Sequence, residues 1–308
     1  MLLHTVPKFM ELQLDFLRDL PLLVKALIMG IVEGLTEFLP VSSTGHLILF
    51  GALLGFDDAR AKVFDLAIQT GAMVAVIWNY RDRFVGIAVR ELPVALGKLP
   101  SALRGGQDLR RWWTDPRWQL SRHLLIAFIP AAILGLAFGG AIKGLLFFPV
   151  PVAIVLILGG FVIFAVERWC RDHPERVRIH DCADLTDWDA LKLGIAQAVA
   201  LIPGTSRSGA TIIGGMMFGL SRKAATEFSF FLAVPTLIAA GAYDLLRNRD
   251  LFQLTDLPMF AIGLLSAYIT ALLVIRWLIR WVSQHSFNSF AIYRIFAGVF
   301  VLSAVYIF

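Results

Sequence analysis

Two short stretches of this 308-residue chain gather the residue types that can do chemistry. The first contains Glu33 and Glu37, which lie four residues apart and therefore on one face of a helix. A run of hydroxyl residues and His46 follow them. The second stretch places Arg207 within another run of hydroxyl residues. One stretch thus offers carboxylates and an imidazole, and the other offers a guanidinium and hydrogen-bond donors.

This set of side chains suits a phosphate group. The guanidinium of Arg207 is a fork of donors that matches phosphate oxygens, and hydroxyls with backbone N–H groups at a helix start can surround them. The expected phosphate-binding residues are therefore Arg207, Ser42, Thr44, Thr205, Ser206 and Ser208. The two close carboxylates can hold a divalent cation, for which we expect Mg²⁺, with Ca²⁺ as the alternative.

Proton transfer and nucleophilic attack also have candidates. His46 can pass a proton near neutral pH, and one of Ser42, Ser43 and Thr44 can supply a nucleophile that a neighbouring base activates. These residues predict phosphoryl transfer or hydrolysis at a membrane-embedded anionic head group. Simpler roles remain open: a glutamate can pair with Arg207 only to hold the structure together, and hydroxyls at helix breaks are ordinarily caps.

The composition indicates what must position these residues. Hydrophobic residues make up 58% of the chain and charged residues only 17%, which excludes disordered and collagen-like proteins. The two cysteines exclude a disulfide scaffold. The net charge of +5 does not indicate a nucleic-acid partner, because the basic residues lie in the gaps between apolar runs. The pattern predicts an all-α polytopic membrane protein embedded in the bilayer as a single domain, residues 1–308.

We expect about six transmembrane helices, because six apolar runs are close to the length that crosses a bilayer. They are Val63–Trp78, Leu124–Ile142, Leu145–Val166, Phe228–Leu246, Leu257–Ile275 and Tyr293–Phe308. Two further apolar stretches, 26–54 and 190–220, are interrupted by proline followed by serine, threonine and glycine. Irregular backbone at membrane depth is tolerated only inside protein or beside water, so both are predicted as re-entrant helical hairpins. We refer to them as the first and the second hairpin.

The two hairpins are related by a shift of about 164 residues. This shift pairs Gly30 with Gly194, Ser42 with Ser206, and other glycines in the same register. Three spans separate the hairpins, so the second is expected to enter from the opposite face. The chain is therefore predicted as an inverted repeat, of residues 22–142 and 145–308 approximately, with the hairpin tips meeting at the midplane.

Basic residues predict the orientation. The segment Arg81–Gln119 holds eight Lys and Arg residues and Arg168–Asp189 holds four, so both are expected in the cytoplasm. The first hairpin then opens to the outside, and so does the site. Within the first segment, Phe84–Leu99 is only partly apolar and is interpreted as an interfacial segment.

Residues 33–46 and 203–211 closely resemble the two motifs of the undecaprenyl-pyrophosphate phosphatase family, also called the bacitracin-resistance protein family. They read EGLTEFLPVSSTGH and PGTSRSGAT. The likeness extends to residues 227–230 and 291–294, and so covers nearly the whole chain. The resemblance implies a multi-pass enzyme of the bacterial inner membrane. Such an enzyme hydrolyses the C55 polyprenyl diphosphate to its monophosphate and inorganic phosphate, which recycles the lipid carrier of peptidoglycan synthesis and counters bacitracin.

Carried over by position, the family's acidic motif falls on Glu33 and Glu37, its serine on Ser43, its histidine on His46 and its arginine on Arg207. The resemblance also implies a divalent cation. We take Ser43 as the expected nucleophile, with Glu37 or His46 as its base; a nucleophilic His46 or a direct attack by water are the alternatives. The competing function is an inverted-repeat transporter or flippase for an anionic polyprenyl lipid.

Overall fold

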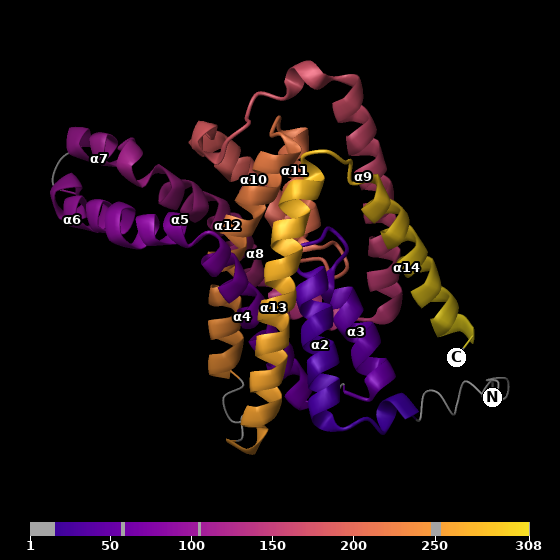
Figure 1. Cartoon of the computed structure of the whole chain (residues 1–308). Helices are drawn as coiled ribbons and strands as arrows, with labels where there is room; N and C mark the ends of the chain where they lie inside the picture. The colour runs from indigo at the N-terminus through magenta and orange to yellow at the C-terminus, as the bar shows by residue number, and fades with distance from the viewer. Residues whose placement is uncertain (1–15, 57–58, 104–105, 248–253, 308) are drawn as a thin grey trace.

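The computed structural model describes residues 16–56, 59–103, 106–247 and 254–307, and over these ranges the chain is all-α (Figure 1). The only pairing of β type within them is one isolated bridge between Ile179 and Leu220. The helices are α2 (Leu22–Thr36), α3 (Ser43–Leu54), α4 (Ala59–Asn79), α5 (Arg81–Gly86), α6 (Leu92–Ala102), α7 (Gly106–Trp113), α8 (Gln119–Leu146), α9 (Pro149–Asp172), α10 (Asp187–Val199), α11 (Arg207–Met217), α12 (Arg222–Arg247), α13 (Leu257–Val282) and α14 (Asn288–Ile307).

The chain is a polytopic membrane protein by the length and apolarity of its helices. Five of them, α8, α9, α12, α13 and α14, can each cross a bilayer, and α4 makes a sixth span if it is counted with the helix that follows it. Five of the six predicted spans each lie within one helix where the structure describes them, whereas Leu145–Val166 crosses the break between α8 and α9. Residue 308 lies outside the described residues. Helix α8 runs through Lys143 to Leu146, and the break comes later, before the proline that opens α9.

Each of the two interrupted stretches forms a helical hairpin, α2–α3 and α10–α11. Ser42 and Ser206 precede the second helix of each hairpin, and both have φ of +73°. Each serine hydroxyl accepts a hydrogen bond from the backbone N–H three residues later, that of Gly45 or of Gly209. The two turns therefore share their backbone geometry at the predicted shift of 164 residues. The inverted relation of the two halves stays a prediction.

Glycines allow the first helix of each hairpin to pack tightly against a long helix. A Cβ on Gly30 would collide with Gly263 and Ser266 of α13, and a Cβ on Gly194 would lie 2.6 Å from the carbonyl oxygen of Ala127 in α8. Close backbone approach of this kind holds membrane helices together without large side chains. Each hairpin is thereby fixed against a spanning helix, so the position of its tip is fixed too.

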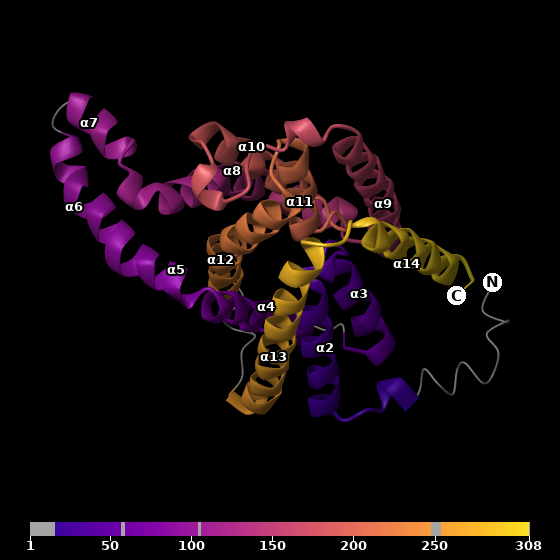
Figure 2. The same cartoon turned by 45° about the horizontal axis from the view of Figure 1, so that its top comes forward.

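Beyond α4 the chain leaves the bundle as a helical arm, residues 81–118 (Figure 2). The helix turns by 84° at Tyr80, continues through α5, a π-helical turn (Ile87–Glu91) and α6, and folds back through α7. The arm and the connection between α9 and α10 lie toward the same end of the bundle (Figure 1). These are the two basic segments, but which side of the membrane they occupy stays a prediction.

Candidate functional site

The turns of the two hairpins contact each other directly. The hydroxyl of Ser208 donates a hydrogen bond of 2.7 Å to the carbonyl oxygen of Leu39, and the Ser206 hydroxyl lies 3.4 Å from the same oxygen. Ser208 has a fully buried side chain. Its hydroxyl therefore holds the two turns together.

Arg294 of α14 reinforces this contact by donating hydrogen bonds to both turns. Its guanidinium donates to the carbonyl oxygen of Pro40 at 3.0 Å in the first turn. It also donates to those of Thr205 at 2.9 Å and Gly204 at 3.0 Å in the second turn. The residue is only 1% exposed, and carbonyl oxygens of α9 satisfy its remaining donors. Arg294 is thus a buried clamp on both turns. The sequence offered only its membership of a resembling motif.

Glu37 lies at the centre of the site and connects the two hairpins chemically. Its Oε2 accepts a 2.6 Å hydrogen bond from the Ser43 hydroxyl. Its Oε1 accepts from Nε and Nη2 of Arg207 at 3.4 and 3.3 Å. A hydroxyl at this distance from a carboxylate has the geometry of a nucleophile beside its base. Three predicted residues from both stretches therefore meet around one carboxylate.

A second group of hydroxyls orients Arg207. Its Nη1 donates to the carbonyl oxygen of Ser229 at 2.9 Å, and the Ser229 hydroxyl lies 2.6 Å from that of Thr211. Ser229 belongs to α12 and is fully buried. Its role was not predicted from the residues, although it falls in the resembling segment 227–230. These contacts leave the guanidinium aimed at Glu37 with little freedom to turn.

His46 is held by partners other than Ser43 and Glu37. Its Nδ1 lies 2.7 Å from the carbonyl oxygen of Ser42, and its Nε2 lies 2.5 Å from the hydroxyl of Tyr293. The two rings are stacked, with centroids 5.6 Å apart and planes at 8°. A carbonyl oxygen can only accept, so Nδ1 carries the proton in the neutral ring and Nε2 accepts from the tyrosine. Tyr293 is thus a site residue that the analysis of residue types missed.

Glu33 fits a cation ligand better than Glu37 does. Its side chain is fully buried, and neither carboxylate oxygen has a hydrogen-bond partner among the described residues. Glu37, in contrast, is occupied by Ser43 and Arg207. Over the described ranges no three His, Cys, Asp or Glu residues are grouped to hold a metal ion. Mg²⁺ commonly uses only one or two protein carboxylates, with substrate phosphates and water completing its shell, so the residues present fit such an ion.

A polar cavity of about 150 Å³ adjoins these groups. Of the predicted residues, it is lined by Glu37, Ser42, Ser43, Thr44, Ser206 and Arg207. Gln69 of α4 adds a further polar group. Four predicted residues, Glu33, His46, Thr205 and Ser208, do not line it. Glu33 and His46 are buried, Ser208 donates to the first turn, and Thr205 lines a separate apolar cavity.

Comparisons with known proteins identify the family of the chain. The profile of the family described as "Bacitracin resistance protein BacA" matches residues 26–300. An undecaprenyl-diphosphatase of Albidiferax ferrireducens is 55% identical over 288 residues, covering 94% of this chain and 97% of the relative. A protein of the same name from Polaromonas naphthalenivorans is 53% identical, over 94% of this chain and 97% of the relative. Another, from Dechloromonas aromatica, is 55% identical, over 92% of this chain and 94% of the relative.

Proposed function

This chain belongs to the bacitracin resistance protein BacA family, and from that membership we propose that it is an undecaprenyl-diphosphatase. It hydrolyses undecaprenyl diphosphate to undecaprenyl phosphate and inorganic phosphate within the membrane. The observation that carries the proposal is Glu37, which contacts both the Ser43 hydroxyl and the Arg207 guanidinium at the edge of a polar cavity. A transporter needs no nucleophile paired with a base, and this pair therefore favours hydrolysis.

In the proposed mechanism Arg207 and the hydroxyls lining the cavity bind the diphosphate. Glu37 accepts the Ser43 proton as the serine oxygen attacks the terminal phosphorus. The bond from that phosphorus to the bridging oxygen breaks, and undecaprenyl phosphate leaves with the electron pair. Water then attacks the phosphorus of the phosphoserine, the bond from phosphorus to the serine oxygen breaks, and Glu37 returns its proton to that oxygen. Inorganic phosphate leaves, and Ser43 and Glu37 are restored. The contacts of His46 support a positioning role, because both of its ring nitrogens already have partners.

Glu33 would hold the divalent cation, with Glu37 as a second ligand if its pairing with Arg207 rearranges. Such an ion supplies positive charge that offsets the charge on the transferred phosphoryl oxygens. The buried, unpartnered oxygens of Glu33 support this assignment. The preference for Mg²⁺ or Ca²⁺ stays a prediction.

We further propose that the enzyme lies in the bacterial inner membrane with the arm in the cytoplasm, so that the first hairpin opens to the periplasmic face. The gathering of the basic segments toward one end of the bundle supports this orientation. The product then re-enters peptidoglycan synthesis as the lipid carrier, and consumption of the diphosphate deprives bacitracin of its target.

Phosphate release by the purified protein in detergent tests the function. We expect release from undecaprenyl diphosphate with Mg²⁺, and its loss with EDTA. Glu37→Ala and Arg207→Ala should each lower kcat/KM by about 10²-fold or more. Glu175→Ala and Arg171→Ala remove exposed charges of the same types far from the cavity and should leave it unchanged. If folded wild-type protein releases no phosphate, flux of the same lipid across liposomes becomes the measurement, and flux without hydrolysis would establish the transporter.

The nucleophile requires a separate experiment. Rapid quenching with substrate labelled at the terminal phosphate should trap a phospho-enzyme, and peptide mapping should place it on Ser43. A phosphoserine survives acid, whereas a phosphohistidine does not. An acid-labile adduct at His46 would replace Ser43 as nucleophile, and incorporation of solvent ¹⁸O into phosphate with no adduct at any time would indicate direct attack by water.

A further inference from the structure

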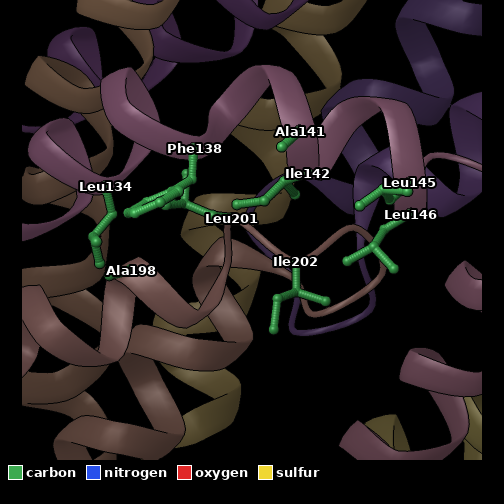
Figure 3. Close-up of a pocket in the computed structure, with 9 residues that line it drawn as sticks. All are labelled: Leu134, Phe138, Ala141, Ile142, Leu145, Leu146, Ala198, Leu201 and Ile202. Atoms are coloured by element: carbon green, nitrogen blue, oxygen red, sulfur yellow. The ribbon is translucent and has the colours of Figure 1, made fainter.

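An apolar cavity of about 400 Å³ lies beside the turn of the second hairpin (Figure 3). One wall is α8 between Leu134 and Leu146, and the other is formed by Ala198, Leu201 and Ile202. Every residue that lines it is apolar. Such a cavity has nothing to offer a phosphate or a cation, but it can accept a hydrocarbon.

This apolar cavity adjoins the polar cavity of the site. Ile202 lines both, and Ala200 of the polar cavity is the chain neighbour of Leu201 in the apolar one. The polar cavity is also lined by Leu237 of α12, a helix that packs against α8. A molecule with a polar head and a hydrocarbon tail can therefore place its head against Glu37 and Arg207 and its first tail atoms along α8.

The outer end of the cavity is open to the surroundings of the bundle. Phe138 is 55% exposed and Leu145 is 73% exposed, and both belong to a membrane-spanning helix. In a bilayer such side chains face lipid. A long tail can thus enter the cavity with its first carbons and leave into the membrane with the rest.

We propose that this cavity binds the isoprene units next to the diphosphate of the substrate and thereby orients the head group in the site. The inference rests on the proposed phosphatase function. Lipid tails are as apolar as leucine side chains, so transfer of the tail from the bilayer gains little by the hydrophobic effect. The gain comes from packing and from alignment, because a tail held along α8 limits the positions that the terminal phosphorus can take beside Ser43.

A second apolar cavity, of about 500 Å³, is the competing location. It lies between α9, α10 and α11 and is also touched by Ile202. Its lining includes two polar side chains, the guanidinium-bearing Arg294 and the hydroxyl-bearing Thr205, whereas every residue lining the cavity along α8 is apolar. The cavity along α8 is therefore the better match to a hydrocarbon tail.

Bulky substitutions in each cavity distinguish the two locations. Ala141→Trp and Ala198→Phe fill the cavity along α8 from opposite walls, and Val162→Trp fills the second cavity. Leu136→Trp is the matched control, because Leu136 belongs to α8, is exposed and lines none of the three cavities. Each variant is assayed with undecaprenyl diphosphate and with methyl diphosphate, which carries no isoprene unit. If wild type binds the short compound without cleaving it, its inhibition constant is measured instead.

We expect Ala141→Trp and Ala198→Phe to raise KM for the long substrate about tenfold, the scale of a lost packing contact of 1.4 kcal/mol. The constants for methyl diphosphate should stay within about twofold of wild type, since it has no tail to place in the filled cavity and the polar cavity is intact in each variant. Val162→Trp and Leu136→Trp should resemble wild type with both. If Val162→Trp alone raises KM for the long substrate, the tail binds in the second cavity instead. If KM is that of wild type in all variants, the tail stays in the lipid. If the wild-type protein hydrolyses no diphosphate, the proposed phosphatase function itself is wrong.

Discussion

The side chains of Glu37 and Arg207 are 5% and 10% exposed, which makes their contact a buried ion pair. Removal of two charges from water costs several kcal/mol, and a pair of well-packed apolar residues would often be more stable. The pair is thus poorly explained by stability alone. A phosphate that enters the cavity can take over the donors of Arg207, which frees Glu37 to act as a base toward Ser43.

Replacement of Arg207 by lysine tests whether the fork geometry matters beyond the charge. Lysine keeps the positive charge but cannot bind two oxygens in a fixed plane. Arg207→Lys should therefore lower kcat/KM for diphosphate hydrolysis by about 10- to 100-fold while the protein stays folded. The matched control is Arg222→Lys, because Arg222 contacts both oxygens of Glu167 with the same fork away from the cavity. That variant should lose thermal stability and keep its kinetics; equal kinetic losses in both would contradict a special role for Arg207.

Removal of one hydroxyl tests the role of Tyr293. Tyr293→Phe keeps the ring stacked on His46 but removes the 2.5 Å contact with Nε2. A hydrogen bond of this kind contributes about 0.5–1.5 kcal/mol, so kcat should fall about two- to tenfold with little change in KM. The pH–rate profile of Tyr293→Phe should also shift, because the variant lacks the hydroxyl that hydrogen-bonds to Nε2 of His46. An unchanged kcat and profile would show that the histidine needs no such support; Tyr268→Phe on α13 is the control.

At the scale of the elements, each hairpin turn depends on a serine with left-handed backbone. Residues other than glycine rarely adopt φ near +73°, and such strain persists where the surrounding structure requires it. In both turns the serine immediately precedes the second helix and accepts a backbone hydrogen bond. The same local solution appears 164 residues apart because both turns must expose hydroxyls and N–H groups toward one cavity.

Two variants of Ser206 separate backbone strain from helix capping. Ser206→Ala keeps the strained φ and loses the cap of Gly209, so it should lower the free energy of unfolding by about 1–2 kcal/mol. Ser206→Gly loses the same cap but relieves the strain, and it should be close to neutral. Thermal unfolding in detergent measures both. A glycine variant that is less stable than the alanine variant would mean that backbone strain contributes nothing at this turn.

The elements were largely predictable from sequence, and the contacts between them were not. Uninterrupted apolar runs specify spanning helices, and proline followed by glycine and hydroxyl residues specifies the turns. The spans predicted as Leu124–Ile142 and Leu145–Val166 meet at Lys143, but the break lies after Leu146, because a lysine near a helix end does not stop the helix. The clamp by Arg294 joins segments about 90 and 254 positions away, and no local pattern encodes such a contact.

At the scale of the whole molecule, the arm carries apolar residues that packing within the bundle does not account for. Its exposed apolar residues, Val85, Val89, Leu92, Leu96 and Leu103, are spaced by four, three, four and seven positions, which keeps them on one helical face. The basic residues Arg83, Arg90 and Lys98 fall on other faces of the same helix. An exposed apolar stripe beside basic residues is typical of a helix that lies in the membrane interface.

Spin labels on single cysteines test whether the stripe is immersed in lipid. In a Cys170→Ala, Cys182→Ala background, Val89→Cys and Leu96→Cys should be accessible to oxygen but protected from a water-soluble nickel complex in vesicles that contain anionic lipid. Arg90→Cys and Gly97→Cys, one position further along the helix, should show the reverse. The contrast should weaken in neutral vesicles at high salt, because basic residues gain about 1 kcal/mol each near an anionic surface. Equal nickel accessibility at all four positions would mean that the arm projects into water, and that its apolar stripe is a surface for another protein.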